Sequence, residues 1–282
     1  IKSVAPEMPV MIGNIATDYN ADTIRRLYKS PANGRFQGAF FNAYSAQIMV
    51  GQNMIKEFDR HGNKDYTIWS EEQSNQRSPH QGDARRYGEA DGPKNMVRTW
   101  LSMATKLHPR IKTITMWGFA PTSAQDIMMM TPDLQPRPQY VAHAVMANAL
   151  ADAEYIGERS TGDMTILEWQ RGDGPFFAVW ANSGKRSLTL EVTSPALTVM
   201  DLMGNCKQIK AVNGLVTLEL TSMPFYLFGG GKTSVSERVV IKVSNGTVKA
   251  GNPIVSVKVV NNGKESIAGK MIISGPGLSS TE

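Results

Sequence analysis

The fold of this chain is indicated first by residues 66–74, Tyr66-Thr67-Ile68-Trp69-Ser70-Glu71-Glu72-Gln73-Ser74. The segment is typical of a short apolar strand that ends in two adjacent carboxylates, and a long polar loop, residues 73–92, follows it. In parallel α/β proteins the carboxyl ends of the strands carry the chemistry. We therefore expect Glu71 and Glu72 to lie at a functional edge of a parallel sheet.

On both sides of this strand, β-prone runs alternate with helical periodicity. The expected strands are residues 8–15, 36–44, 66–70 and 111–117, and the expected helices are residues 22–28, 47–60, 94–107 and 138–156. Four such βα units predict a parallel sheet that is covered by helices and connected by right-handed crossovers.

The pattern changes after Gly157, where short apolar runs are separated by Gly, Asn, Asp and Ser. The expected strands are residues 165–169, 176–180, 188–192, 197–202, 215–220 and 224–228, with two more at 238–243 and 254–260. Frequent short strands predict an antiparallel sandwich. We expect three domains: half of a (β/α)8 barrel at 1–158, a β-sandwich at 159–231, and part of an immunoglobulin-like β-domain at 232–282.

Composition excludes several classes of protein. Of the 282 residues, 41% are hydrophobic, which is normal for a globular protein. The net charge is +5, and the basic residues are spread along the chain without forming a run, so a nucleic-acid partner is not expected. No segment is long and apolar enough to span a membrane. The single Cys206 excludes an intramolecular disulfide. The four histidines lack metal-ligand spacing, and no cofactor is expected; they are His61, His80, His108 and His143.

Four βα units cannot close an eight-stranded barrel. Three interpretations remain open: an open doubly wound sheet, a half-barrel that dimerises, and the C-terminal half of a barrel whose first half is missing. No glycine-rich phosphate loop follows any expected strand, which argues against a nucleotide-binding sheet. The chain also begins with Ile1 rather than with an initiator methionine. Both observations favour the third interpretation, the C-terminal half of a larger barrel.

Short motifs occur in a characteristic order along the chain. They are Phe40-Phe41-Asn42-Ala43-Tyr44, Ile68-Trp69-Ser70-Glu71, Ile114-Thr115-Met116-Trp117, Phe176-Phe177-Ala178-Val179-Trp180 and Val199-Met200-Asp201-Leu202-Met203-Gly204-Asn205. The first three resemble the sixth, seventh and eighth barrel strands of clan A glycoside hydrolases, and the last two resemble their accessory β-sandwich. The resemblance covers about residues 1–230. It departs from the family pattern at Asn42, where a histidine is usual, and no Asn-Glu pair for the acid/base glutamate occurs anywhere in the chain.

The resemblance implies a retaining mechanism, which needs two carboxyl groups about 5–5.5 Å apart. Glu71 and Glu72 cannot form that pair, because neighbouring residues of a strand point to opposite faces. The Ser-Glu pattern favours Glu71 as the nucleophile, Glu72 remains the alternative, and a charged strand end that is simply solvated would explain both. Tyr44 is expected to hydrogen-bond the nucleophile, Trp117 to stack on a sugar ring, and Asn42 to bind a sugar hydroxyl.

These inferences predict a secreted or cell-surface glycoside hydrolase that acts on a polysaccharide or glycoside. Its partners are a carbohydrate substrate and the missing N-terminal half of the barrel, which would contribute the acid/base. The alternative function is a catalytically inactive barrel that serves as a carbohydrate-binding or structural module of a cell-surface assembly.

Overall fold

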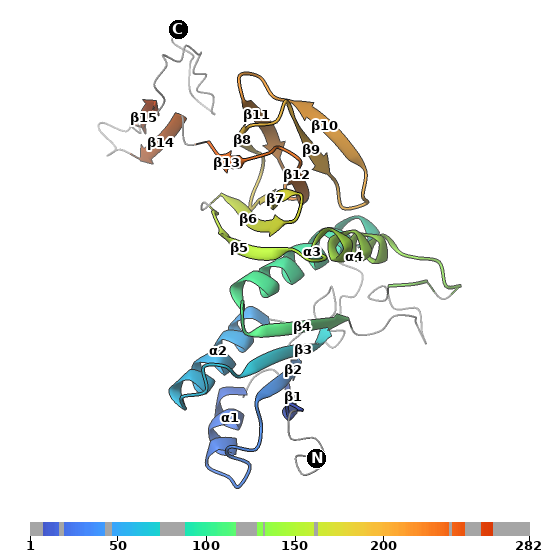
Figure 1. Ribbon diagram of the computed structural model, residues 1–282, viewed down its shortest axis with the longest axis vertical. Helices are drawn as coiled ribbons and strands as arrows, with labels where there is room; N and C mark the ends of the chain where they lie inside the picture. The colour runs from blue at the N-terminus through green and yellow to red at the C-terminus, as the bar shows by residue number, and fades with distance from the viewer. Residues whose placement is uncertain are drawn as a thin grey trace, which may run out of the picture.

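The structure combines a parallel α/β part with antiparallel sheets (Figure 1). It is a computed structural model that describes residues 8–16, 20–42, 47–73, 88–116, 129–131, 133–160, 163–236, 239–245 and 255–261. Helices α3 and α4 lie between the parallel sheet at one end and the antiparallel strands at the other (Figure 1).

The parallel sheet has four strands in chain order. They are β1 (Met11–Ala16), β2 (Gly38–Asn42), β3 (Thr67–Gln73) and β4 (Ile111–Met116), and all neighbouring pairs are parallel. The helices are α1 (Asn20–Tyr28), α2 (Gln47–Arg60), α3 (Gly88–Lys106) and, after β4, α4 (Pro138–Ala149). The predicted parallel sheet with intervening helices is therefore confirmed.

One face of this sheet forms a core with the helices. Alternate strand residues such as Ala39, Phe41 and Ile68 are fully buried, and they pack with buried side chains of α1, α2 and α3. Strands in unbroken order with crossovers of one hand place every helix on the same side of a sheet. Unbroken strand order is also a feature of (β/α) barrels, whereas a doubly wound sheet reverses its strand order and covers both faces.

The second half of the described chain forms two antiparallel sheets that share a core. The six-stranded sheet contains β5 (Glu154–Glu158), β6 (Met164–Arg171), β7 (Gly174–Ala181), β9 (Ala196–Met200), β10 (Cys206–Lys210) and β12 (Phe225–Phe228). The three-stranded sheet contains β8 (Arg186–Val192), β11 (Leu215–Leu220) and β13 (Thr233–Val235). Buried residues of both sheets, among them Phe177, Val179, Leu190 and Leu218, pack together. A separate hairpin consists of β14 (Val239–Asn245) and β15 (Val255–Asn261).

Helices α3 and α4 join the two parts through a common apolar cluster. Trp100 and Met96 of α3 and Met146 of α4 pack against Trp180 and Tyr226 of the six-stranded sheet. Helix α3 also places Met103 in the core of the parallel sheet, and Leu107, which directly follows the end of the helix, joins the same core. One helix thus contributes to both cores, which ties the antiparallel part to the parallel sheet.

Two helix boundaries differ markedly from the sequence predictions. Helix α4 ends at Ala149 rather than at residue 156, with Leu150 as its C-cap, and residues 154–158 instead pair with β6 as strand β5. Helix α3 begins at Gly88, with Pro93 inside it, so the predicted loop at 73–92 ends earlier. Both Gly92 and Pro93 are buried, which indicates that tertiary packing holds this turn in spite of the proline. The predicted division into three domains stays a prediction.

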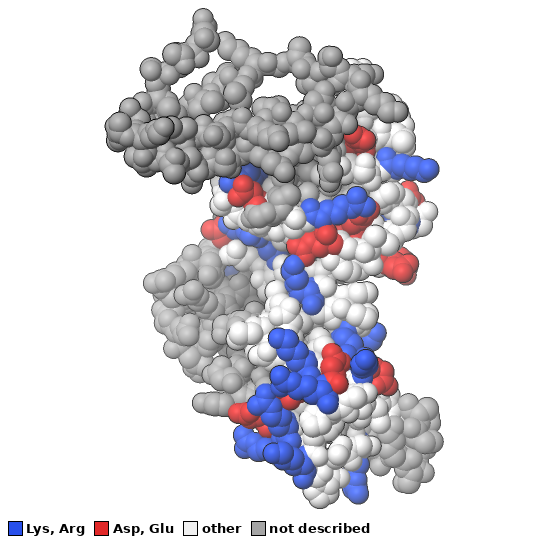
Figure 2. All heavy atoms as spheres, turned by 90° about the vertical axis from the view of Figure 1, so that its left-hand side faces the viewer, with Lys and Arg blue, Asp and Glu red and all other residues white. Residues whose placement is uncertain are grey.

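Basic side chains gather over the part of the molecule that contains α1 and α2 (Figure 2). Several of these cations are paired: Arg25 with Asp22 and Glu57, Arg60 with Glu57, and Arg110 with Asp59. No described helix is long and apolar enough to cross a membrane.

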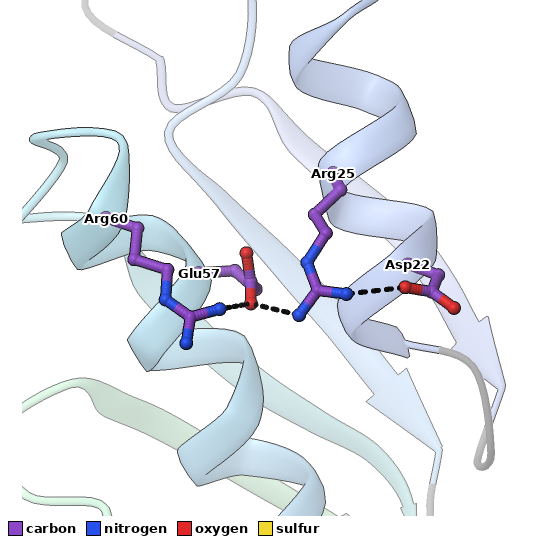
Figure 3. A network of polar contacts seen from close by, with 4 residues as sticks. All are labelled: Asp22, Arg25, Glu57 and Arg60. Atoms are coloured by element: carbon purple, nitrogen blue, oxygen red, sulfur yellow. Dashed lines mark hydrogen bonds and ion pairs between the residues drawn. The ribbon is translucent and has the colours of Figure 1, made fainter.

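Glu57 is the buried centre of the ion pairs between α1 and α2 (Figure 3). Its side chain is 4% exposed, and Oε1 accepts hydrogen bonds from Arg25 Nη2, at 2.7 Å, and from Arg60. The hydrogen bond from Arg25 lowers the pKa of the Glu57 carboxyl below its ordinary 4.5, against the opposing effect of burial. A lowered pKa stabilises the folded state above the pKa of the unfolded chain, and this contribution disappears as the pH falls through the folded-state pKa.

We predict that Glu57→Gln lowers the free energy of unfolding at pH 7 by about 1–2 kcal/mol, because charge-assisted hydrogen bonds are replaced by neutral ones. The difference from the wild type should shrink as the pH falls below the ordinary carboxyl pKa of 4.5 and through the lowered pKa of the folded state, where the wild-type carboxylate also becomes neutral. Urea unfolding from pH 3 to pH 7 measures both effects. Glu219→Gln is the matched control, since the Lys185–Glu219 pair is 70% and 62% exposed and should contribute little. A pH-independent loss would contradict the role of the Glu57 charge.

Candidate functional site

The carboxyl ends of β1 to β4 meet at one edge of the sheet. This follows from the parallel pairing, in which Ala16 lies beside Asn42, Phe41 beside Ser70, and Gln73 beside Met116. In Figure 1 the arrowheads of β3 and β4 point in the same direction. The last residues of the four strands therefore lie along one edge of the sheet.

Glu71 and Glu72 belong to β3 itself, which runs to Gln73 rather than ending at Ser70. The register between β3 and β4 shifts at this point: Ser70 lies opposite Ile114 and Gln73 opposite Met116, so three steps on β3 match two on β4. Such an extra residue is an irregularity of the β-bulge kind, which we call the bulge below, and it locally interrupts the ladder. In a regular strand, neighbouring residues point to opposite faces of the sheet. Because the register shifts between Ser70 and Gln73, this rule cannot be used to choose between Glu71 and Glu72.

Ser70, the residue before these glutamates, is held by burial of its side chain and by a hydrogen bond to its backbone. Ser70 is fully buried, and its hydroxyl has no hydrogen-bond partner among the described residues. Its backbone carbonyl accepts a hydrogen bond from Thr115 Oγ1 of β4 at 3.1 Å. Thr115 is the β4 residue that lies within the shifted interval between Ile114 and Met116. The bulge is thus bounded by a buried serine and a cross-strand hydroxyl.

Asn42 is the last residue of β2 and is half-buried. The pairing of β2 with β3 ends at Phe41 and Ser70, the residues that directly precede Asn42 and Glu71. The predicted role of Asn42 stays a prediction. Tyr44 and Trp117 lie outside the described residues, and their roles stay predictions.

The face of the sheet opposite the helices is lined by interlocking side chains. The Phe40 and Trp69 rings meet edge to face at 5.5 Å and 79°. A Cβ on Gly13 would lie 2.8 Å from the Phe40 ring, and a Cβ on Gly38 would lie 2.8 Å from the sulfur of Met11. The two glycines make room for large neighbours on this face, where Phe40 and Trp69 are half-buried. Sequence reasoning missed this packing, although the glycines at 13 and 38 inside two expected strands were its visible signal.

The described histidines make ring contacts rather than a metal site. His61 stacks on Tyr28 at 3.7 Å, His108 packs on Tyr155, and His143 packs on Trp100. Burial lowers the pKa of His143, which favours its neutral form against the Trp100 ring. Within the described ranges no three His, Cys, Asp or Glu side chains gather in a way that could hold a metal ion.

Comparison with known proteins shows similarity in fold. No protein-family profile and no curated protein sequence matches the chain. Among solved structures it is similar to a family 39 glycoside hydrolase from the gut symbiont Bacteroides cellulosilyticus WH2, with a TM-score of 0.63, 15% identity, and coverage of 80% of this chain and 51% of that one.

Two further structures show the same relationship. One is a GH30 endoxylanase from Clostridium papyrosolvens C71, with a TM-score of 0.53, 9% identity, and coverage of 83% of this chain and 58% of that one. The other is a glucosidase from Croceicoccus marinus, with a TM-score of 0.53, 10% identity, and coverage of 80% of this chain and 61% of that one. The chain thus spans about half of these proteins, and the resemblance to clan A glycoside hydrolases is confirmed at the level of fold.

We predict that Gly38→Ala destabilises the protein by about 1–3 kcal/mol through overpacking of the face opposite the helices. The new Cβ would lie 2.3 Å from the Thr67 carbonyl oxygen, a backbone atom that cannot rotate away. Urea denaturation with an unchanged m-value measures the loss. Gly157→Ala in β5 is the control, because nothing lies within 4 Å of its Cβ position. Equal stability of Gly38→Ala and the wild type would show that this face is loosely packed.

Proposed function

We propose that this chain forms part of the active site of a retaining glycoside hydrolase that acts on a polysaccharide or glycoside. The observation that carries the proposal is the position of Glu71 and Glu72, at a bulge in β3, on the edge where four parallel strands end. Asn42 ends the neighbouring strand β2, which pairs with β3 up to Phe41 and Ser70. The similarity in fold to the three enzymes above supports this placement, since (β/α) barrels carry their chemistry at the carboxyl edge.

The proposal includes a larger barrel. Helices cover one face of the four-stranded sheet, and the other face carries the half-buried rings of Phe40 and Trp69, large side chains of the kind that fill the interior of a barrel. Strands β1 and β4 are the outer strands of this sheet, and each pairs with one neighbour among the described strands. We propose that a further segment with four more βα units closes the barrel through these two strands and contributes the acid/base carboxyl.

In this mechanism Glu71 attacks the anomeric carbon as a carboxylate. A bond forms between its oxygen and the anomeric carbon while the bond to the leaving oxygen breaks, and the acid/base residue gives that oxygen a proton. Water then cleaves the glycosyl ester, with the same acid/base residue accepting a proton from it. Tyr44 would keep the nucleophile ionised, Trp117 would support the sugar ring, and Asn42 would bind a sugar hydroxyl.

Glu71 is preferred over Glu72 as the nucleophile because it follows Ser70 in the Ser-Glu pattern of the resemblance. The bulge leaves Glu72 as the alternative, because faces do not alternate strictly across it. A polysaccharide substrate also favours a location outside the cell, either secreted or at the cell surface.

We predict that a 2-deoxy-2-fluoro glycoside with a good leaving group labels Glu71 when the protein containing this chain and the rest of the barrel is treated with it. Glu71→Gln should lower kcat on the order of 10⁴-fold, the scale of loss when a catalytic nucleophile is removed, and Glu72→Gln should lower it far less. Peptide mapping by mass spectrometry locates the label.

Two other outcomes are informative. A label on Glu72, with the larger loss of activity in Glu72→Gln, would reverse the assignment within the same mechanism. Absence of hydrolysis and of labelling, combined with retained binding to polysaccharides in affinity electrophoresis, would contradict the enzyme and favour the catalytically inactive carbohydrate-binding module.

A further inference from the structure

The backbone that carries the candidate nucleophile is not held by a regular ladder. Between the Ser70–Ile114 pair and the Gln73–Met116 pair, β3 has one more residue than β4. Ladder hydrogen bonds fix peptide orientation in a regular parallel sheet, and a bulge interrupts them locally. The orientation of the Ser70–Glu71 peptide must therefore depend on contacts other than strand pairing.

Two such contacts meet at Ser70. Its side chain is fully buried on the helix-covered face, which fixes the Cα position from one side. From β4, Thr115 Oγ1 donates a hydrogen bond to the Ser70 carbonyl oxygen at 3.1 Å. That carbonyl belongs to the peptide group that ends at the nitrogen of Glu71, so the hydrogen bond orients the peptide plane directly before Glu71.

Threonine is well suited to this position. Its β-branched side chain has few allowed χ1 rotamers, so its hydroxyl is directed by the strand backbone rather than by a flexible chain. The side chain of Thr115 lies on the face of Trp69 and Thr113, because Trp69 pairs with Thr113 and alternate residues share a face. The hydroxyl therefore reaches the bulge from the face that carries the aromatic layer.

We infer that Thr115 is a positioning residue for Glu71, acting through the Ser70 carbonyl. This inference rests on the proposed function, since it assigns Thr115 a part in aligning the nucleophile. Nucleophilic attack requires near-ideal geometry, and a displacement of about 1 Å can lower the rate on the order of 10²-fold. Loss of the Thr115 hydroxyl should thus impair the chemical step more than substrate binding.

The test compares three variants in the protein that contains the complete barrel. Thr115→Val removes the hydroxyl and keeps the shape of the side chain, and it should lower kcat about 10- to 100-fold with KM nearly unchanged. Thr115→Ser restores the donor and should recover most of kcat. Thr113→Val makes the same change two residues earlier on the same face, where the structure gives the hydroxyl no hydrogen bond to a described residue, and it should leave kcat and the melting temperature close to wild type.

The outcomes separate this inference from the proposed function. Full kcat in Thr115→Val, alongside an inactive Glu71→Gln, would overturn the role of Thr115 and leave the enzyme intact. Equal losses in Thr115→Val and Thr113→Val, or no recovery in Thr115→Ser, would show a purely structural effect and also overturn it. An inactive wild type would remove the proposed function and this inference with it. Independently of activity, a crystal structure of Thr115→Val in which the Ser70–Glu71 peptide keeps its wild-type orientation would contradict the inference.

Discussion

The order of the four parallel strands is the constraint on which the rest of the structure depends. Because β1 to β4 follow one another in space as they do in sequence, crossovers of a single hand place α1, α2 and α3 on one face. The same order aligns all four carboxyl ends on one edge. The position of the candidate site and the absence of described helices from the opposite face are thus two consequences of one topology.

The two edges of the parallel sheet differ in their polar chemistry. At the amino edge, before β4, Arg110 binds the Asp59 carboxylate at 2.8 Å and the Asn63 carbonyl at 3.0 Å, and it also binds the Tyr66 carbonyl. These hydrogen bonds tie the loop before β3 to the start of β4. At the carboxyl edge the described polar groups include Asn42, Ser70 and Thr115, arranged around a bulge. Contacts at the amino edge satisfy carbonyls of the loop before β3, whereas the ladder at the carboxyl edge is interrupted.

Much of the fold was predictable from periodicity, since apolar spacing is strong wherever a helix or strand buries one face. Helix α2 and strand β11 have the predicted bounds, and the other predicted strands are displaced by a few residues. Three strands were missed for a physical reason: β5 and β10 are edge strands with mainly exposed residues, and β13 is only three residues long. Their pairing is determined by tertiary contacts, and their local sequences carry little alternation.

The sequence was sufficient to predict at which edge of the sheet the candidate residues lie, but not the backbone geometry there. The sequence places Asn42, Glu71 and Glu72 at strand ends, and parallel pairing brings those ends together. The sequence contains no signal for the register shift, because the shift depends on which residues of β4 lie opposite β3. Thr115 is therefore an ordinary strand residue in sequence and becomes distinctive only when the two strands are paired. A side chain that sets the direction of its neighbour's backbone is defined by register, and register between strands about forty residues apart is a property of the folded sheet.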